Sequence, residues 1–336
     1  MNVLLVERRG MESMRTNLVK AHSDTQRIFR DAGVVDVFPV PSAQQGPRPY
    51  FVPIRDIEQG IRRVVQDAGV DVRYRSTLDS IVHTGDRVTA RVVHDGLHPY
   101  AEQVEAAVLI DATAGRVASQ IEPRLTMQSH PGSGYAIGVH WLEGIPTAGS
   151  VTSNAESLEA PGLRLDVAVK ALGGTFTGHH DALRGTFGVL ELDTQPTAVE
   201  HRALVEELGA RLGLTTAPDS SYDFPIANRA ASAVHAGRLA IVGDSVTRLR
   251  PRTGVGLNLG ALDARDAAAL IEHLHAIDTT PGSVPRSMRV GHAFERFATG
   301  ARTSGSSSSG EGVLTRHRHA LHAELRPSPF QERRAR

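Results

Sequence analysis

The first third of the chain mixes short apolar runs with segments of helical periodicity. Residues 3–6 form a continuous valine and leucine run, which is typical of a strand buried on both faces of a parallel sheet. Residues 23–32 and 54–68 predict helices, each closed by a following glycine. Further strands are predicted where residues alternate or form apolar runs, at 70–74, 78–84, 87–94 and 104–110.

The middle of the chain changes to short alternating runs rich in glycine. They predict antiparallel strands at 135–141, 163–169 and 185–192, followed by a helix at 197–212. Residues 239–242 return to the buried, parallel type of strand. Helices are predicted after it at 256–276 and 286–300.

This order of elements predicts an α/β fold with two lobes. A Rossmann-like, doubly wound lobe is expected from the discontinuous segments 1–125 and 226–276, and a mostly antiparallel substrate lobe from 126–225. The expected remainder is a C-terminal helix (277–303), a flexible Ser/Gly linker (304–312), and a short basic helix with a charged tail (313–336).

Composition narrows the class of protein. Lys plus Arg and Asp plus Glu both number 37, so the chain lacks the net positive field that favours nucleic-acid binding. It contains no cysteine, which excludes disulfides and thiolate sites and fits a cytoplasmic protein. No apolar stretch approaches the roughly 18 residues that a membrane span needs. His319 and His322 share a helix face without further ligands, so no metal site is expected.

The strongest candidate site follows the strand at 239–242. That strand delivers Gly243 and Asp244 at its carboxyl end, and a glycine-containing turn then opens the helix at 256. Glycines allow close backbone approach to a ligand, and free N–H groups in a first helical turn favour negative charge. Asp244 can accept hydrogen bonds from ligand hydroxyls. The alternative is a strand, turn and helix with a capping aspartate.

This stretch resembles the FAD-dependent monooxygenases of the p-hydroxybenzoate hydroxylase type. That family carries a Gly-Asp motif and a Pro-x-x-Gly-x-Gly-x-Asn helix start. The resemblance implies that Asp244 binds the ribityl chain of FAD and that the helix N-terminus faces the flavin pyrimidine ring. It implies cofactor contacts for Gly243, Asp244, Pro251, Gly254, Gly256, Leu257 and Asn258.

Three other positions agree with the resemblance in order and spacing. Glu7 ends a strand and matches the acidic residue that holds the adenosine ribose. Arg55 matches a family arginine or glutamine that reaches the cofactor. Asp111 begins Asp-Ala-Thr-Ala-Gly-Arg, which is close to the second aspartate motif of flavin epoxidase relatives. Taken singly, Glu7 is equally an edge charge, Arg55 a helix-start arginine and Asp111 a loop aspartate.

The chain departs from the family at its beginning. No Gly-x-Gly-x-x-Gly turn precedes Glu7, so we expect an N-terminally incomplete FAD lobe and weak FAD binding. An N-terminally truncated member of the family is favoured over a relative that no longer binds FAD. Replacement charge for the pyrophosphate is expected from Arg8, Arg15 or Arg55.

The resemblance implies an FAD-dependent oxidoreductase with NAD(P)H as reductant. The expected reaction is hydroxylation or epoxidation of an aromatic or polyene small molecule in secondary metabolism. No catalytic side chain stands out, as expected where the flavin carries the chemistry. The alternatives are a cyclase or isomerase in which FAD is structural or absent, and a non-catalytic remnant.

Overall fold

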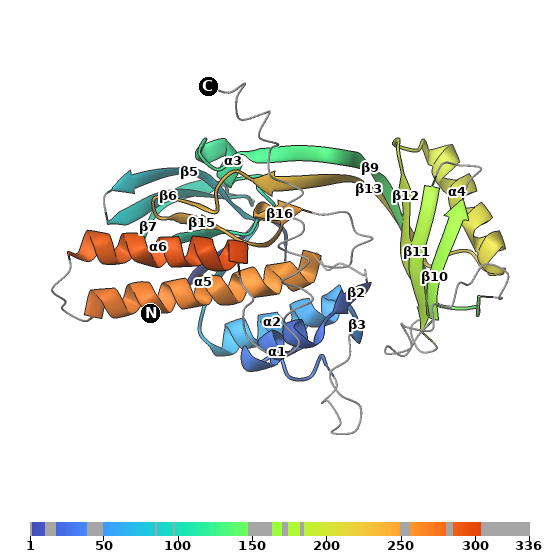
Figure 1. Ribbon diagram of the computed structural model, residues 1–336, viewed down its shortest axis with the longest axis horizontal. Helices are drawn as coiled ribbons and strands as arrows, with labels where there is room; N and C mark the ends of the chain where they lie inside the picture. The colour runs from blue at the N-terminus through green and yellow to red at the C-terminus, as the bar shows by residue number, and fades with distance from the viewer. Residues whose placement is uncertain are drawn as a thin grey trace.

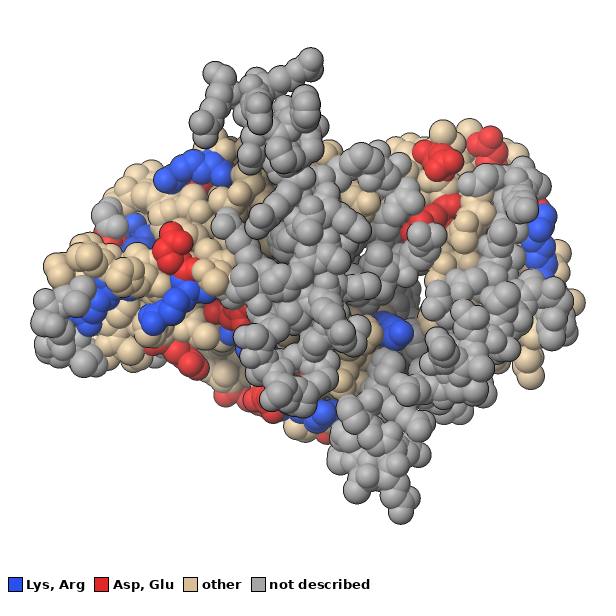
Figure 2. Space-filling view, in the orientation of Figure 1, with Lys and Arg blue, Asp and Glu red and all other residues tan. Residues whose placement is uncertain are grey.

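The structure is a computed structural model that describes residues 2–10, 18–38, 50–84, 86–96, 98–146, 163–169, 174–181, 185–248, 256–279 and 285–303. Figure 1 shows two parts joined by the long strands β9 (Met127–Trp141) and β13 (Ser220–Ala231), which run side by side. The expected linker and tail at 304–336 lie outside the described residues. Figure 2 shows positive and negative side chains interspersed on one face.

The N-terminal segment forms two separate strand pairs with two helices. The predicted first strand is present as β1 (Leu4–Glu7), but Val3 and Leu5 are 44% and 39% exposed, so the prediction of burial on both faces is wrong. The physical reason is that β1 pairs along one edge only and borders a large cavity. β1 pairs in parallel with β4 (Asp71–Tyr74). The second pair is antiparallel and consists of β2 (Leu18–Ala21) and β3 (Tyr50–Pro53), and the two helices are α1 (Ser23–Asp31) and α2 (Ile54–Asp67).

The strands predicted at 78–84 and 87–94 form a hairpin, which is the start of a three-stranded antiparallel sheet. It consists of β5 (Ser76–Thr84), β6 (Arg87–His94) and β7 (Tyr100–Ala106). The single strand predicted at 104–110 is wrong, because the chain changes sheets within it. Residues up to Ala106 pair with β6, whereas β8 (Leu109–Asp111) pairs in parallel with β15 (Leu239–Ile241).

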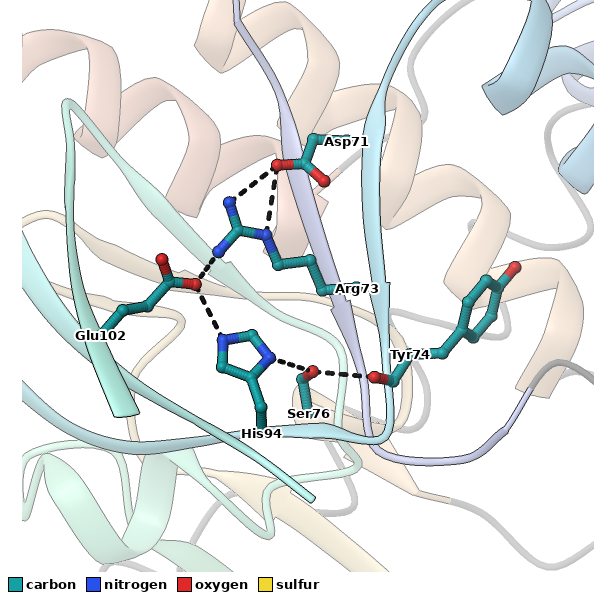
Figure 3. A network of polar contacts seen from close by, with 6 residues as sticks. All are labelled: Asp71, Arg73, Tyr74, Ser76, His94 and Glu102. Atoms are coloured by element: carbon teal, nitrogen blue, oxygen red, sulfur yellow. Dashed lines mark hydrogen bonds and ion pairs between the residues drawn. The ribbon is translucent and has the colours of Figure 1, made fainter. Parts of the chain in front are cut away.

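A polar network joins β4 to the three-stranded sheet (Figure 3). His94 is bonded through both ring nitrogens, with Nδ1 2.8 Å from Ser76 Oγ and Nε2 2.8 Å from Glu102 Oε1. The Glu102 carboxylate also pairs with Arg73, and the Arg73 guanidinium lies 2.9 Å from the Asp71 carboxylate. Because these residues come from four strands, the network fixes the β1–β4 pair relative to the rest of the lobe.

Two long helices cover the β8–β15 region. They are α5 (Gly256–Thr279) and α6 (Arg286–Thr303), which lie against each other in Figure 1. Their apolar side chains share one core with β15 and with the short elements α3 (Ala118–Ile121) and β14 (His235–Ala236). In the part of the chain that is described, no helix is long and apolar enough to cross a membrane.

The other part of the molecule is a six-stranded sheet with one helix. The strand order is β10-β11-β12-β9-β13-β16, built with β10 (Leu163–Val169), β11 (Gly174–Asp181), β12 (Gly185–Leu192) and β16 (Thr247–Arg248). Helix α4 (Ala198–Leu212) begins after Thr197, which forms a capping box with Glu200. Its leucines pack on Ile137, Val139 and Trp141 of β9. Because strand side chains alternate, the opposite face of the sheet is left to border the cavity.

Glu122, at the end of α3, carries the clearest pH-dependent contribution to stability. Hydrogen bonds from the Arg124 side chain (2.7 and 2.8 Å) and backbone, with the Arg124 charge, outweigh burial and hold the pKa of this carboxyl at about 2. His83 Nε2 adds a contact at 3.3 Å. A lowered folded-state pKa contributes stability that is fully present above the unfolded value of 4.5 and is lost as pH falls towards 2.

We therefore expect Glu122→Gln to destabilise the protein at pH 7 and to flatten the acid limb of its stability profile. Urea denaturation at pH 7, 4 and 3 measures both effects. The difference in midpoint between wild type and variant should shrink as pH is lowered. A difference that stays constant across this range would show that the Glu122 charge contributes nothing.

Candidate cofactor and substrate site

A cavity of about 2920 Å³ extends from the open face of the six-stranded sheet past the ends of β1 and β8, and it also borders α2 and the last turns of α5. Pockets for a single small molecule usually measure about 300–1000 Å³. The cavity therefore has room for more than one ligand. Its walls include the ends of β1 and β8, the turn after β15, the first turn of α5, and side chains of β9, β11, β12 and β13.

The turn after β15 packs closely on α5. Gly243 has a φ of +62°, which favours glycine, and its N–H donates to Asp263 Oδ2 at 2.9 Å. The next residue, Asp244, is exposed at the cavity wall, and its Oδ1 lies 3.8 Å from where a Cβ on Gly256 would be. Gly256 is the first residue of α5, so the structure brings the Asp244 carboxylate to the helix N-terminus.

The Asp111 motif lies beside this turn. The Asp111 carboxylate is 3% exposed and accepts from the backbone N–H groups of Thr113 (2.7 Å) and Ala118 (3.0 Å). The loop is joined to the neighbouring motif because Gly115 N–H donates to Ser245 Oγ at 2.9 Å. Asp111 borders the cavity, but its carboxylate is engaged in shaping its own loop.

Glu7 and Arg8 also line the cavity, at the end of β1. Burial would raise the pKa of the Glu7 carboxyl, but hydrogen bonds and charge from Arg9, with the charge of Arg8, outweigh it and lower the pKa. Glu7 Oε1 accepts from the Arg9 backbone N–H at 2.8 Å. The carboxylate is thus held ionised, which suits an acceptor for ligand hydroxyls.

The remaining sequence candidates are placed differently. Arg55 is exposed, pairs with Asp56 at 3.4 Å, and is not among the residues that line the cavity. Leu257 lines the cavity and packs near Val52. Pro251, Gly254 and Arg15 lie outside the described residues.

Asn258 is fully buried and joins α5 to the N-terminal segment. Its Oδ1 accepts from His22 N–H at 2.8 Å and from Thr25 Oγ1 at 2.6 Å, while its Nδ2 donates to the Lys20 carbonyl at 2.9 Å. The side chain therefore links α5 by hydrogen bonds to a segment more than 230 residues earlier in the chain. The predicted cofactor contact of Asn258 stays a prediction, and its side chain is engaged within the protein.

Two further residues support the site. Asp263 belongs to the motif that the sequence singles out, though no role is predicted for it, and Ser245 was missed from the sequence. Asp263 holds the Gly243 N–H, and Ser245 holds the Gly115 N–H. The signal for Asp263 is its spacing: Gly256, Gly260 and Asp263 stand at i, i+4 and i+7, which places them on one face of α5. No local signal could have shown that Ser245 reaches a loop 130 residues earlier.

Among the described residues, no group of three or more His, Cys, Asp or Glu side chains is arranged to hold a metal ion. The prediction that His319 and His322 form no metal site concerns residues outside those that the structure describes.

The fold and site define a nucleotide-binding α/β protein with an antiparallel sheet facing its ligand cavity. The chain belongs to the family described as the FAD binding domain, whose match covers residues 5–277. The resemblance inferred from Asp244 and the α5 start is thereby confirmed at the level of the family.

Solved structures with the same fold extend this comparison. The chain is similar to the anhydrotetracycline hydroxylase OxyS from Streptomyces rimosus (19% identity, 98% of this chain, 66% of that chain, TM-score 0.66). It is similar to the p-nitrophenol 4-monooxygenase PnpA from Pseudomonas putida DLL-E4 (15%, 99%, 86%, TM-score 0.67). It is also similar to the Diels-Alderase PyrE3 of pyrroindomycin biosynthesis (21%, 100%, 71%, TM-score 0.59). The chain spans about two thirds of the length of OxyS.

Proposed function

We propose that the protein is an FAD-dependent monooxygenase that hydroxylates or epoxidises an aromatic or polyene small molecule, with NAD(P)H as reductant. The observation that carries the proposal is the juxtaposition of Asp244 with the N-terminus of α5 at the wall of the cavity. The names of two similar solved structures, an anhydrotetracycline hydroxylase and a p-nitrophenol 4-monooxygenase, support the reaction class. The cysteine-free composition supports a cytoplasmic location.

The described residues fit the hydroxyl-bearing and ring-edge parts of a flavin dinucleotide. Asp244 supplies an exposed carboxylate for vicinal hydroxyls, and Glu7 supplies a second, ionised one at the end of β1. The first turn of α5 offers backbone N–H groups and the positive end of a helix dipole to an electron-rich ring edge. In this proposal Arg8 provides charge for phosphate groups. Bound FAD would supply the redox chemistry with NAD(P)H and oxygen.

The protein's own contribution is positioning and exclusion of water. The open face of the six-stranded sheet presents Tyr222, Phe224 and Phe187 to the same cavity as Asp244. An apolar, aromatic surface opposite a flavin holds an aromatic substrate in place and keeps water from the reacting centre. This division of roles explains why the site needs no prominent acid or nucleophile.

Asp244→Ala is the direct test of the cofactor site. The change removes an acceptor for two hydroxyl groups, so we expect a loss of about 1.5–3 kcal/mol in FAD binding, which raises the Kd roughly tenfold to a hundredfold. Titration of the protein into FAD, followed by flavin fluorescence, measures the Kd. Asp36→Ala is the matched control, because Asp36 is exposed, pairs with Arg63 and does not line the cavity. An unchanged Kd in Asp244→Ala would contradict the proposed site.

A cyclase with a structural or absent flavin is the second candidate function. The observation that favours it is the similarity to PyrE3, which is described as a Diels-Alderase. NAD(P)H-dependent oxygen consumption separates the two functions. Uptake of oxygen that requires both NAD(P)H and FAD supports the monooxygenase, whereas a stoichiometric FAD complex that consumes no oxygen with any aromatic substrate supports the cyclase.

A further inference from the structure

We propose that His94 is a positioning residue for the ligand-binding end of β1, and that it acts in its doubly protonated form. The inference rests on the proposed function, because it concerns how the protein holds Glu7, one of the two carboxylates proposed to accept from hydroxyl groups of FAD. It is carried by the hydrogen bonds around the imidazole and by the contacts that connect them to Glu7.

The hydrogen bonds around His94 require two ring protons. Ser76 Oγ has a single proton, which it donates to the Tyr74 carbonyl at 2.9 Å. The 2.8 Å contact between Ser76 Oγ and His94 Nδ1 therefore needs a proton on Nδ1. The Glu102 carboxylate only accepts, so its 2.8 Å contact with Nε2 needs a second ring proton. All three bonds, drawn in Figure 3, form together only when the imidazole carries both protons.

The charges around the ring favour the same state. The charged and titratable groups of the network come from three other strands and are Asp71 and Arg73 of β4, Ser76 of β5, and Tyr100 and Glu102 of β7. The two carboxylates outnumber the single guanidinium, so a protonated imidazole balances the charge. Ser76 and His94 are buried, where an unpaired donor or acceptor is costly. The Tyr100 ring stacks on the imidazole at 4.2 Å and 18°, which fixes the plane of the ring.

The network is connected to Glu7 through the junction between β4 and β5. Tyr74 stands opposite Glu7 in the β1–β4 register. The next residue, Arg75, has a φ of +52°, a conformation that a non-glycine residue keeps only where its surroundings hold it. Its N–H donates to the Arg9 carbonyl at 3.3 Å, and its carbonyl accepts from the Asp95 N–H at 2.7 Å. The Arg9 N–H in turn donates to the Glu7 carboxylate at 2.8 Å.

The position of the Glu7 carboxylate therefore depends on a strained junction that the His94 network holds on its other side. When the imidazole loses a proton, one of its three hydrogen bonds is lost, and the backbone at Arg75 is held less firmly. The Arg9 N–H that orients Glu7 then moves with it. The pKa of the Glu7 carboxyl is lowered, chiefly by Arg9 against the effect of burial, so Glu7 stays ionised while His94 titrates. FAD affinity should thus be highest with His94 protonated and fall as pH rises.

The experiment measures the Kd of the full chain for FAD, by flavin fluorescence, from about pH 5.5 to about pH 8.5, which spans most of the range in which histidine side chains change charge. His94→Gln keeps one N–H donor but cannot take up a proton. Its Kd should exceed that of the wild type about threefold to tenfold at the low end of the range and approach it at the high end. Ser76→Ala, which removes the link from the ring to the junction, should raise the Kd by a similar factor and flatten its pH dependence.

Two controls separate positioning of Glu7 from a general loss of structure. His98→Gln removes an exposed histidine from the turn between β6 and β7, so it should keep the pH dependence of the wild type. FMN lacks the adenosine ribose that the family resemblance assigns to Glu7. The Kd for FMN should therefore be the same, within about twofold, in His94→Gln and the wild type.

Hydrogen–deuterium exchange in residues 5–10 gives a readout that needs no ligand. The Arg9 N–H is bonded to Glu7, so this segment should exchange faster in His94→Gln than in His98→Gln at the low end of the pH range. Circular dichroism establishes that each variant is folded; should His94→Gln not fold, Ser76→Ala decides the question. The same pH dependence in wild type and folded variant, or equal weakening of FAD and FMN, would overturn the proposal.

The His94 role and the cofactor site fail separately in this design. A protein that binds neither flavin would refute the proposed monooxygenase, and exchange in residues 5–10 would then decide whether His94 holds the Glu7 end. FAD binding that depends on Asp244, together with a pH dependence that His94→Gln leaves unchanged, would refute the His94 role alone.

Discussion

Asp111→Ala is expected to destabilise the protein by about 2–5 kcal/mol, because it leaves two backbone N–H groups without their acceptor in a buried site. Those groups belong to Thr113 and Ala118, on either side of the loop that Ser245 ties to the Gly243 turn. Loss of the carboxylate should loosen both turns at once. Urea denaturation gives the free energy of unfolding, and FAD titration should show weakened binding in the same variant.

Two comparisons sharpen this test. Asp111→Asn keeps one oxygen acceptor but turns an NH₂ group towards a donor, so it should fall between Ala and the wild type. Asp79→Ala is the control for a surface carboxylate, since its pair with Arg91 is 48% exposed on both sides and should contribute no more than about 1 kcal/mol. Equal effects of Asp111→Ala and Asp79→Ala would show that the buried hydrogen bonds do not hold the loop.

Gly188→Ala is expected to cost about 2–3 kcal/mol, because the added methyl group would have to displace well-packed atoms. Gly188 stands opposite Gly178 in the β11–β12 register, and the buried ring of Phe176 covers both. A Cβ on Gly188 would lie 2.5 Å from Phe176 Cζ, 2.5 Å from Gly178 Cα and 2.6 Å from the Thr177 carbonyl oxygen. Two of these three atoms are backbone, so the strain cannot be relieved by turning one side chain.

The control for this variant is Gly291→Ala in α6. A Cβ there meets nothing within 4 Å, and alanine is a better helix former than glycine by about 0.5–1 kcal/mol. Thermal unfolding should therefore show a lower Tm for Gly188→Ala and an equal or higher Tm for Gly291→Ala. A Gly188→Ala protein as stable as the wild type would mean that Phe176 does not pack against the glycine pair.

Local elements were predictable from the sequence because their causes are local. The capping residue Thr197 and the helical spacing of leucines determine α4, and β5 and β6 were predicted from alternating residues on either side of the sequence Gly85-Asp86. The proposed cofactor motif could also be predicted, because Asp244 and Gly256 are only twelve residues apart in the sequence, between a strand and a helix.

The tertiary structure decided everything that depends on which segments meet. The apolar run at 104–110 carries no sign that it changes sheets at Ala107 and Val108, because both of its halves are apolar strands and only their partners differ. The same holds for Asn258, whose amide groups are satisfied by residues near position 22 and not by its neighbours in the helix.

The sequence by itself determined the strand–turn–helix that presents Asp244, because backbone conformation and capping act over a few residues. Only the tertiary structure placed Tyr222, which lines the cavity that Asp244 borders, over Gly138. That contact depends on strand register, which is fixed by hydrogen bonds and packing between strands distant in the chain. The side chains of the proposed substrate face are thus set by long-range pairing, whereas the proposed cofactor motif is set by local geometry.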